Sequence, residues 1–169
     1  ETSRKGNFFG ILGMSIAILV TFLFVNILFI SFLYIICALA IGGSIGSIIA
    51  YRISMTAMPQ LVAGFHSLVG LAAVLVALSA FYNPEAFGLG MPNSIKTASL
   101  VEMSIGASIG AITFTGSVIA FLKLQGLMSG APITFKGQHF INLLIGIGIV
   151  SLIIYITINQ SNHIFWILI

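Results

Sequence analysis

The sequence predicts an all-α membrane protein, a polytopic bundle with about five complete transmembrane spans and the start of a sixth. The first observation is composition, because 59% of the 169 residues are hydrophobic and only 5% are charged. Soluble domains carry about 25% charged residues, so this chain has too little polar surface to cover itself in water. The second is a mean hydropathy of +1.21, which rests on several long apolar stretches. A soluble enzyme acting alone is therefore excluded.

The spans follow from the length of each apolar stretch. Residues 8–50 are apolar almost throughout and would form a helix about 65 Å long, twice the thickness of a bilayer core. They are therefore expected to fold back, near Asn26. The connector 83–97 is rich in Pro and Gly, which favours turns. In chain order, the spans are expected at about 8–25, 28–50, 58–82, 98–123 and 139–158, with 163–169 as the first two turns of another.

The basic residues predict the orientation of these spans. The alternating loops place five of them on one side of the membrane and only Lys96 on the other. An excess of Lys and Arg marks cytoplasmic loops. The N-terminus and the loops 51–57 and 124–138 are therefore expected in the cytoplasm, through Arg4, Lys5, Arg52, Lys123 and Lys136.

Small residues indicate which helix faces pack, because they let helix backbones approach closely in a membrane. Gly42 and Gly46 in the second span are interpreted as packing positions. On the third span, Gly70, Ala73 and Ala77 fall within about 40° of His66 at 100° per residue. That face is predicted to pack and to place His66 in the bundle interior. The opposite side carries leucines that are expected to meet lipid, namely Leu68, Leu71, Leu75 and Leu78.

The fourth span carries a second small and polar stripe and is predicted to be central. Much of its remaining surface is also small or polar, which suits a helix with neighbours on several sides. The stripe lies within about 80° of Glu102 and consists of Gly106, Gly110, Thr113, Ser117 and Ala120.

Ionisable residues inside a membrane are candidate functional residues, because keeping them there costs free energy. His66 is the histidine furthest from a helix end, and imidazole can relay a proton; the alternative is a neutral histidine bonded to a carbonyl or hydroxyl. Glu102 is either an interfacial carboxylate or the outer mouth of a polar pathway. Thr113 and Ser117 either extend that pathway or bond to the carbonyl four residues back. Asn142 is a further buried polar candidate.

Other kinds of site find no support in the sequence. Three isolated histidines and one cysteine make no metal-ligand spacing, so no metal site is expected. Six scattered basic residues form no patch for nucleic acid. No nucleotide-binding or catalytic motif occurs, since Gly146-x-Gly148 lies inside an apolar span without a preceding strand. No catalytic residue and no bound cofactor are therefore expected in this chain.

Three blocks of sequence resemble the β subunit of proton-translocating NAD(P) transhydrogenase. The segment MTAMPQLVA at 55–63, followed by FHSLVGLAAVLV at 65–76, is similar to the histidine-bearing span of that subunit. The segment GAITFTGSVIAF at 110–121 is similar to its next signature. Residues 1–10 resemble its first cytoplasmic loop. The blocks occur in the order of the family and cover most of the chain.

The resemblance implies a function that composition does not reveal. In this family a membrane domain couples hydride transfer between NAD(H) and NADP(H) to proton translocation. His66 then matches the family's proton-pathway histidine, and Ser117 matches its serine. Residues 1–169 would be part of the proton-translocating domain in the inner membrane, with an earlier helix, later helices and the NADP(H)-binding domain lying outside the chain. NAD and NADP would bind other domains.

The resemblance also implies partners, and two other classes of function are kept beside it. The expected partners are the transhydrogenase α subunit and the NADP(H)-binding domain, in a dimer of complete units. This chain by itself is not expected to be catalytic. The alternatives are an ion-coupled transporter and a structural membrane subunit, both without a redox role.

Overall fold

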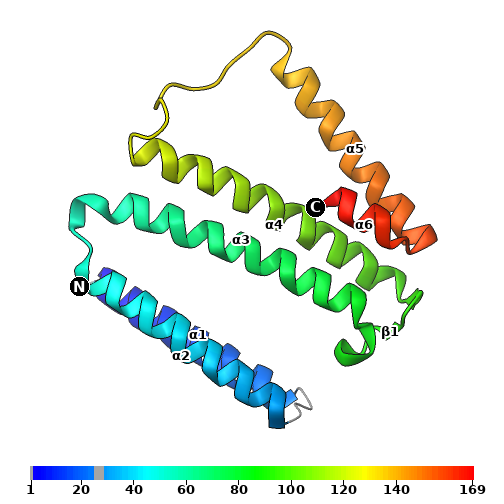
Figure 1. Ribbon diagram of the computed structural model, residues 1–169, viewed down its shortest axis with the longest axis horizontal. Coiled ribbons are helices and arrows are strands. Elements are labelled where there is room, and N and C mark those ends of the chain that lie inside the picture. The colour runs from blue at the N-terminus through cyan, green and yellow to red at the C-terminus, as the bar shows by residue number, and fades with distance from the viewer. Residues whose placement is uncertain (1, 25–28) are drawn as a thin grey trace. The chain divides into compact units, whose positions relative to one another are not determined.

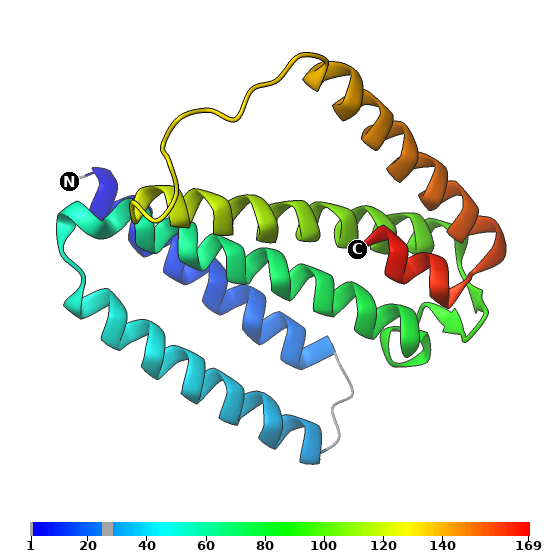
Figure 2. The same ribbon diagram turned by 45° about the horizontal axis from the view of Figure 1, so that its top comes forward.

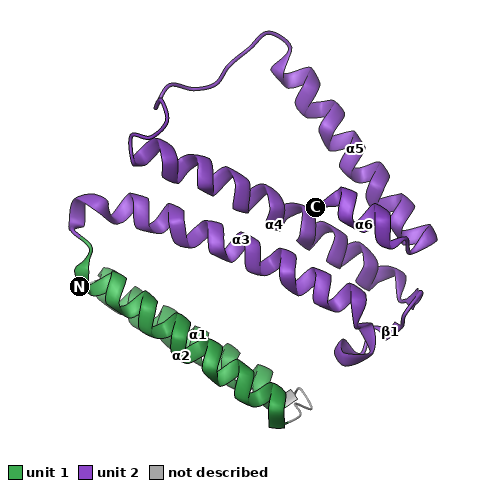
Figure 3. Cartoon of the chain, in the orientation of Figure 1, with its two compact units in different colours: residues 1–53 green, residues 54–169 purple. Residues whose placement is uncertain are grey.

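The computed structural model describes residues 2–24 and 29–169, and it divides the chain into two compact units (Figures 1 and 3). Unit 1 comprises residues 1–53, and unit 2 comprises residues 54–169. The turn predicted near Asn26 lies outside the described residues.

Unit 1 consists of two long apolar helices, α1 (Thr2–Phe24) and α2 (Phe29–Arg52). The two run in opposite directions alongside each other (Figure 2). The rings of Phe22 and Phe32 meet edge to face, with centroids 5.7 Å apart. Hydroxyl groups along both helices donate to the carbonyl four residues back, as at Ser44, whose Oγ lies 2.6 Å from the oxygen of Ala40. These side chains are thus satisfied without leaving the helix surface.

Unit 2 contains three long helices and one short one. They are α3 (Met58–Tyr82), α4 (Thr97–Leu124), α5 (Gln138–Asn159) and α6 (Asn162–Leu168), with a short 3₁₀ helix η1 (Met55–Ala57) before α3. Pro59 stands in the first turn of α3, where its missing N–H costs nothing. Helix α4 contacts α3, α5 and α6, so the prediction of a central fourth span is confirmed within this unit.

The connector between α3 and α4 is folded rather than irregular. It contains a 3₁₀ helix, η2 (Pro84–Phe87), and a hairpin of two short strands, β1 (Gly90–Met91) and β2 (Ser94–Ile95). Gln160 holds the edge of β2 with its side-chain amide: it accepts from the N–H of Ile95 at 3.0 Å and donates to the carbonyl of Ile95 at 3.2 Å. The amide therefore joins the connector to the turn between α5 and α6.

The hydrophobic core of unit 2 lies beside the connector, where α3 ends and α4 begins. The ring of Phe165 on α6 is fully buried and stacks on Phe81 of α3, with centroids 4.2 Å apart. Beside this stack, the indole N–H of Trp166 donates to the Tyr82 hydroxyl at 2.7 Å. Leu100 of α4 and Ile156 of α5 are also fully buried in the cluster. Four helices therefore meet at one end of the unit.

Replacing Phe165 by alanine is expected to destabilise this end of unit 2. Truncation of a buried Phe removes its packing contacts and leaves a cavity, at a cost of about 3 kcal/mol. The measurement is thermal unfolding of the purified protein in detergent. Ile167→Ala on the same helix is the control, because Ile167 is 65% exposed. Equal losses for the two variants would contradict the packing described here.

The predicted spans agree with the observed helices. Five helices in the described residues are long and apolar enough to cross a membrane, and α6 occupies the expected start of a sixth. The largest difference is at the first span, which begins at Thr2 rather than near residue 8. Helix geometry does not require apolar residues, so the polar residues 2–7 extend the helix beyond its apolar stretch.

Candidate functional site

The candidate site is built on a close crossing of α3 and α4 at two glycines. A Cβ placed on Gly70 would lie 2.5 Å from the backbone nitrogen of Phe114 and 2.8 Å from the carbonyl oxygen of Gly110. A Cβ placed on Gly110 would lie 2.8 Å from the carbonyl oxygen of Gly70. Backbone therefore meets backbone at this point, and no larger residue fits. This is the small-residue packing expected of membrane helices.

The crossing fixes which residues of α3 and α4 lie at the same level. Nearer the start of α3, a Cβ on Gly64 would touch the ring of Phe121 at 3.6 Å. One turn earlier, the Nε2 of Gln60 donates to the carbonyl of Leu124 at 3.1 Å. The two helices run antiparallel along this whole length (Figures 1 and 2). His66, two residues beyond Gly64, is therefore level with residues 117–119 of α4.

His66 lies at the edge of the packed face of α3, not in its centre. The buried residues of α3 include Ser67, Gly70, Val74 and Ala77, whereas His66 itself is exposed. Within unit 2, His66 therefore lies beside the packed face, and its place in the interior of the complete bundle stays a prediction. The physical reason is angular, because the face packed on α4 centres near Gly70, about 40° around the helix from His66.

Two of the predicted polar partners lie on the same pair of helices. Ser117 is half-buried at the level of His66, and Thr113 is half-buried one turn earlier in α4. The Cβ of Thr113 lies 3.0 Å from a Cβ placed on Gly70, so Thr113 belongs to the crossing itself. Thr113 and Ser117 on α4 thus lie within about one helical turn of the level of His66 on α3.

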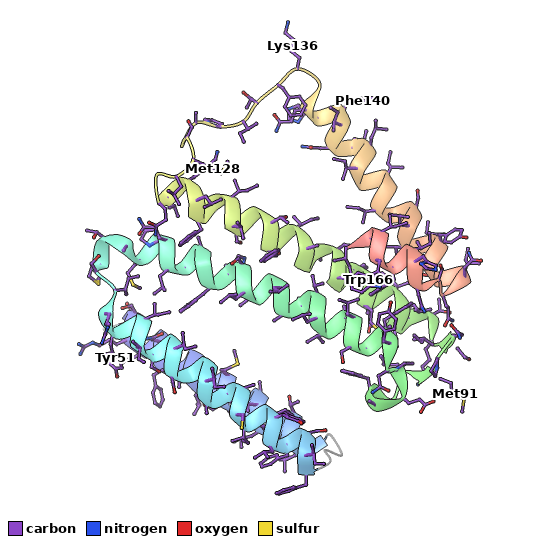
Figure 4. The ribbon with its side chains drawn as sticks, viewed as in Figure 1. Tyr51, Met91, Met128, Lys136, Phe140 and Trp166 are labelled. Atoms are coloured by element: carbon purple, nitrogen blue, oxygen red, sulfur yellow. The ribbon has the colours of Figure 1, made fainter. Side chains whose placement is uncertain are left out.

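Glu102 and Asn142 lie elsewhere. Glu102 is exposed near the start of α4, about 22 Å along the helix from Ser117. Asn142 is also exposed, so its predicted burial is not found. It lies in the first turns of α5, which stand apart from α4 in both views, and the labelled Phe140 marks this part of the helix (Figures 2 and 4). Neither side chain joins His66 in the described structure.

The glycines predicted for packing divide into two groups. Gly70 and Gly110 form the crossing, so these two predictions are confirmed. A Cβ placed on Gly42, Gly46 or Gly106 would meet no atom within 4 Å, so no close helix contact occurs there in the respective unit. A glycine permits two helix backbones to come close, but they do so only where a second helix lies against that glycine.

The outward-facing leucines of α3 follow the predicted pattern with one exception. Leu68, Leu71 and Leu75 are exposed, as expected for side chains that meet lipid. Leu78 instead packs partly buried against the core around Phe81. The exception arises because α6 and the connector cover the end of α3.

Two buried polar atoms were missed by the sequence analysis. The Oε1 of Gln60 and the Oγ of Ser104 are buried and have no hydrogen-bond partner among the described residues. Ser104 could have been singled out by its place, with Ser108 and Thr115, on one stripe of the fourth span. No sequence pattern marked Gln60. Within the described residues, no group of three or more His, Cys, Asp or Glu side chains is arranged to hold a metal.

The comparisons with known proteins identify the family. The complete chain, residues 1–169, matches the family model described as NAD(P) transhydrogenase beta subunit. This chain belongs to that family. Two curated relatives from Rhodospirillum rubrum, both named NAD(P) transhydrogenase subunit beta, are 58% identical to it over 139 residues. The match covers 82% of this chain and 30% of each relative, so the chain spans about a third of their length.

The family and the helices together define the setting of the site. The chain is a multi-pass membrane protein, and it represents membrane-spanning sequence of a transhydrogenase β subunit. The resemblance drawn from residues 55–76 and 110–121 is therefore confirmed. Those two segments are also the ones that meet at the Gly70–Gly110 crossing.

Proposed function

We propose that this chain is the membrane part of an NAD(P) transhydrogenase through which protons cross the bilayer. The observation that carries the proposal is family membership along the whole chain, combined with an ionisable side chain on a membrane span. Such a residue is retained against its cost in free energy, which favours a functional role. His66 is that residue in α3.

In the proposed mechanism, hydride transfer and proton movement are separate but coupled steps. A hydride passes from NADPH to NAD⁺ on nucleotide-binding domains and yields NADP⁺ and NADH. His66 accepts a proton from one side of the membrane and releases it to the other, since imidazole can bind a proton at one nitrogen while donating from the other. Ser117 and Thr113 are the nearest candidates to pass it on, because they occupy the adjoining length of α4.

The partners and location follow from the same proposal. NAD and NADP bind other domains of the complex, and this chain itself holds no cofactor. The α subunit and the NADP(H)-binding domain are its partners in a dimer of complete units, in the inner membrane. The ends of α3 and α4 joined by Gln60 and Leu124 face the cytoplasm, because Lys123 and Lys136 lie at that end.

The function is tested in the complete complex reconstituted into liposomes. Adding NADPH and an analogue of NAD⁺ is expected to change the internal pH, and a protonophore should abolish the change without stopping hydride transfer. A preparation without the nucleotide-binding domains should move no protons. Transport by that preparation would favour the alternative of an ion-coupled transporter, and hydride transfer without any change in pH would exclude coupling.

A further inference from the structure

The α4–α5 connector, residues 125–137, exposes large apolar side chains although it lies outside the spans. Three of them are more than half exposed, namely Leu127 at 73%, Ile133 at 66% and Phe135 at 52%. None of the three belongs to the hydrophobic core that the described residues of unit 2 form. Apolar side chains that gather on an exposed surface mark a contact with lipid or with another protein.

The first half of this connector is folded back on the end of α4. Gly126 has a left-handed backbone (φ 74°), and its N–H donates to the Lys123 carbonyl at 3.1 Å. The next N–H, that of Leu127, donates to the Leu122 carbonyl at 3.0 Å, which completes a Schellman motif. The Nζ of Lys123 also donates to the Ala131 carbonyl at 2.8 Å. The connector therefore leaves α4 along a fixed path.

The charges at this connector are all positive. Lys123 and Lys136 flank it, and residues 123–139 contain no Asp or Glu. Lys136 points away from α4 and α5 (Figure 4). The ammonium group of Lys123 has three hydrogens, and since the Ala131 carbonyl takes one, the other two can donate to a phosphate. Lysines combined with large apolar side chains are typical of segments that lie on an anionic membrane surface.

The lengths of the two helices place the connector at the surface of the bilayer. Helix α4 has 28 residues and is about 42 Å long, which equals the hydrocarbon core together with both headgroup layers. Helix α5 has 22 residues and is about 33 Å long, close to the core alone. The connector therefore starts at the level of the headgroups and returns to the edge of the core. Leu127 and Phe135 are each three residues from a helix, within about 11 Å of its end.

We propose that the α4–α5 connector is a binding surface for anionic phospholipids. Leu127, Ile133 and Phe135 enter the boundary of the acyl chains, and the ammonium groups of Lys123 and Lys136 bind lipid phosphates. The inference goes beyond the proposed function, and it requires only that α4 and α5 cross the membrane. The competing occupant is a protein surface, which would cover the same apolar side chains.

The test is fluorescence quenching in the complete complex reconstituted into liposomes. In a background with Cys37→Ala and other cysteines replaced, Ile133→Cys is labelled with an environment-sensitive fluorophore. The vesicles contain equal amounts of phosphatidylcholine and phosphatidylglycerol, and only one of the two lipids carries brominated acyl chains, which quench the label on contact. The ratio of quenching by the two lipids measures which of them is enriched at the connector.

Phosphatidylglycerol is expected to be preferred about twentyfold, because each of the two lysines favours an anionic surface by about fivefold. Lys136→Gln removes one charge and should lower the preference about fivefold, whereas Lys136→Arg keeps the charge and should retain it. Salt at about 1 M should also lower the preference, since it screens exposed charges. If the Ile133→Cys variant does not assemble, Phe135→Cys provides the same measurement.

Met91→Cys on the connector between α3 and α4 is the matched control. Met91 is 69% exposed, but Glu85 and Lys96 leave its connector without net charge, so the two lipids should quench its label equally. Equal quenching of the Ile133 label would overturn the proposal. Blue-shifted emission that neither lipid quenches would mean that protein covers the connector, and it would overturn the proposal too. Both results are independent of proton pumping.

Discussion

Replacing His66 by alanine in the complete complex is expected to stop proton movement and to lower coupled turnover about a hundredfold. A positioned acid–base group contributes on the order of 10²–10⁴ in rate, and alanine leaves nothing that can carry the proton at this position. His66 is exposed at the edge of the α3 packed face, so its removal should not disturb the crossing with α4. Loss of function is therefore expected without loss of folding.

The measurement follows hydride transfer and internal pH together in liposomes. His139→Ala and His163→Ala are the matched controls, because both histidines are exposed near helix ends. They should pump like the parent. His66→Asn separates titration from hydrogen bonding, since asparagine can bond to a neighbour but cannot bind a proton at neutral pH. A structural role for His66 predicts normal pumping by the asparagine variant, and the proton-relay role predicts none.

Coupling adds a second readout for the same variants. If the nucleotide state changes the proton affinity of His66, then its protonation must change nucleotide affinity by the same factor. We therefore expect NADP(H) affinity to depend on pH in the parent complex and to lose part of that dependence in His66→Ala. If the alanine variant pumps normally, His66 is a packing residue. The pathway would then have to pass along Thr113 and Ser117 toward Glu102.

The sequence determined the spans well because hydropathy is a local property. Length and apolar content suffice to locate a membrane helix, and the first span differs only where polar residues extend it. The packing of one helix against another depends on residues that are far apart in the sequence. The glycines at 42, 46, 70, 106 and 110 look alike in the sequence, and among the described residues of each unit only those at 70 and 110 meet a second backbone. Which glycines matter depends on the neighbouring helix, and one sequence does not contain that geometry.

The candidate site shows the same limit. Helical periodicity correctly placed Thr113 and Gly110 on one side of α4, but it could not rank His66 against Gly70 as the centre of the α3 face. The two differ by about 40°, which is less than the width of a packed helix face. Glu102 was joined to Thr113 and Ser117 by helical periodicity, which fixes an angle around the helix but not a distance along it, and Asn142 was added by chemical type alone. The structure separates them because they lie near helix ends far from the crossing.

Substituting alanine for Gly110 or Gly70 is expected to force α3 and α4 apart. Each new methyl group would meet a backbone atom below 3.0 Å, and backbone cannot move aside as the end of a flexible side chain can. Overpacking of this kind costs about 3 kcal/mol. Since His66 and Ser117 owe their common level to this crossing, each variant should also impair proton pumping.

The measurement is thermal unfolding of the detergent-solubilised protein, with Gly106→Ala and Gly116→Ala as matched controls on α4. A Cβ at either control position meets no atom of the described residues within 4 Å, and alanine favours a helix more than glycine does. The controls should therefore be as stable as the parent or more stable. If Gly110→Ala resembles Gly116→Ala, the helices are not in backbone contact.

The double variant Gly70→Ala/Gly110→Ala tests whether the two glycines act at one contact. Both clashes are relieved by the same separation of the helices, so the second substitution should cost less than the first. Residues in contact commonly show interaction energies of about 0.5–3 kcal/mol, whereas distant sites add. Additive losses would mean that each glycine is needed for a separate reason, and the α3–α4 crossing would then not be the single element that aligns His66 with Ser117.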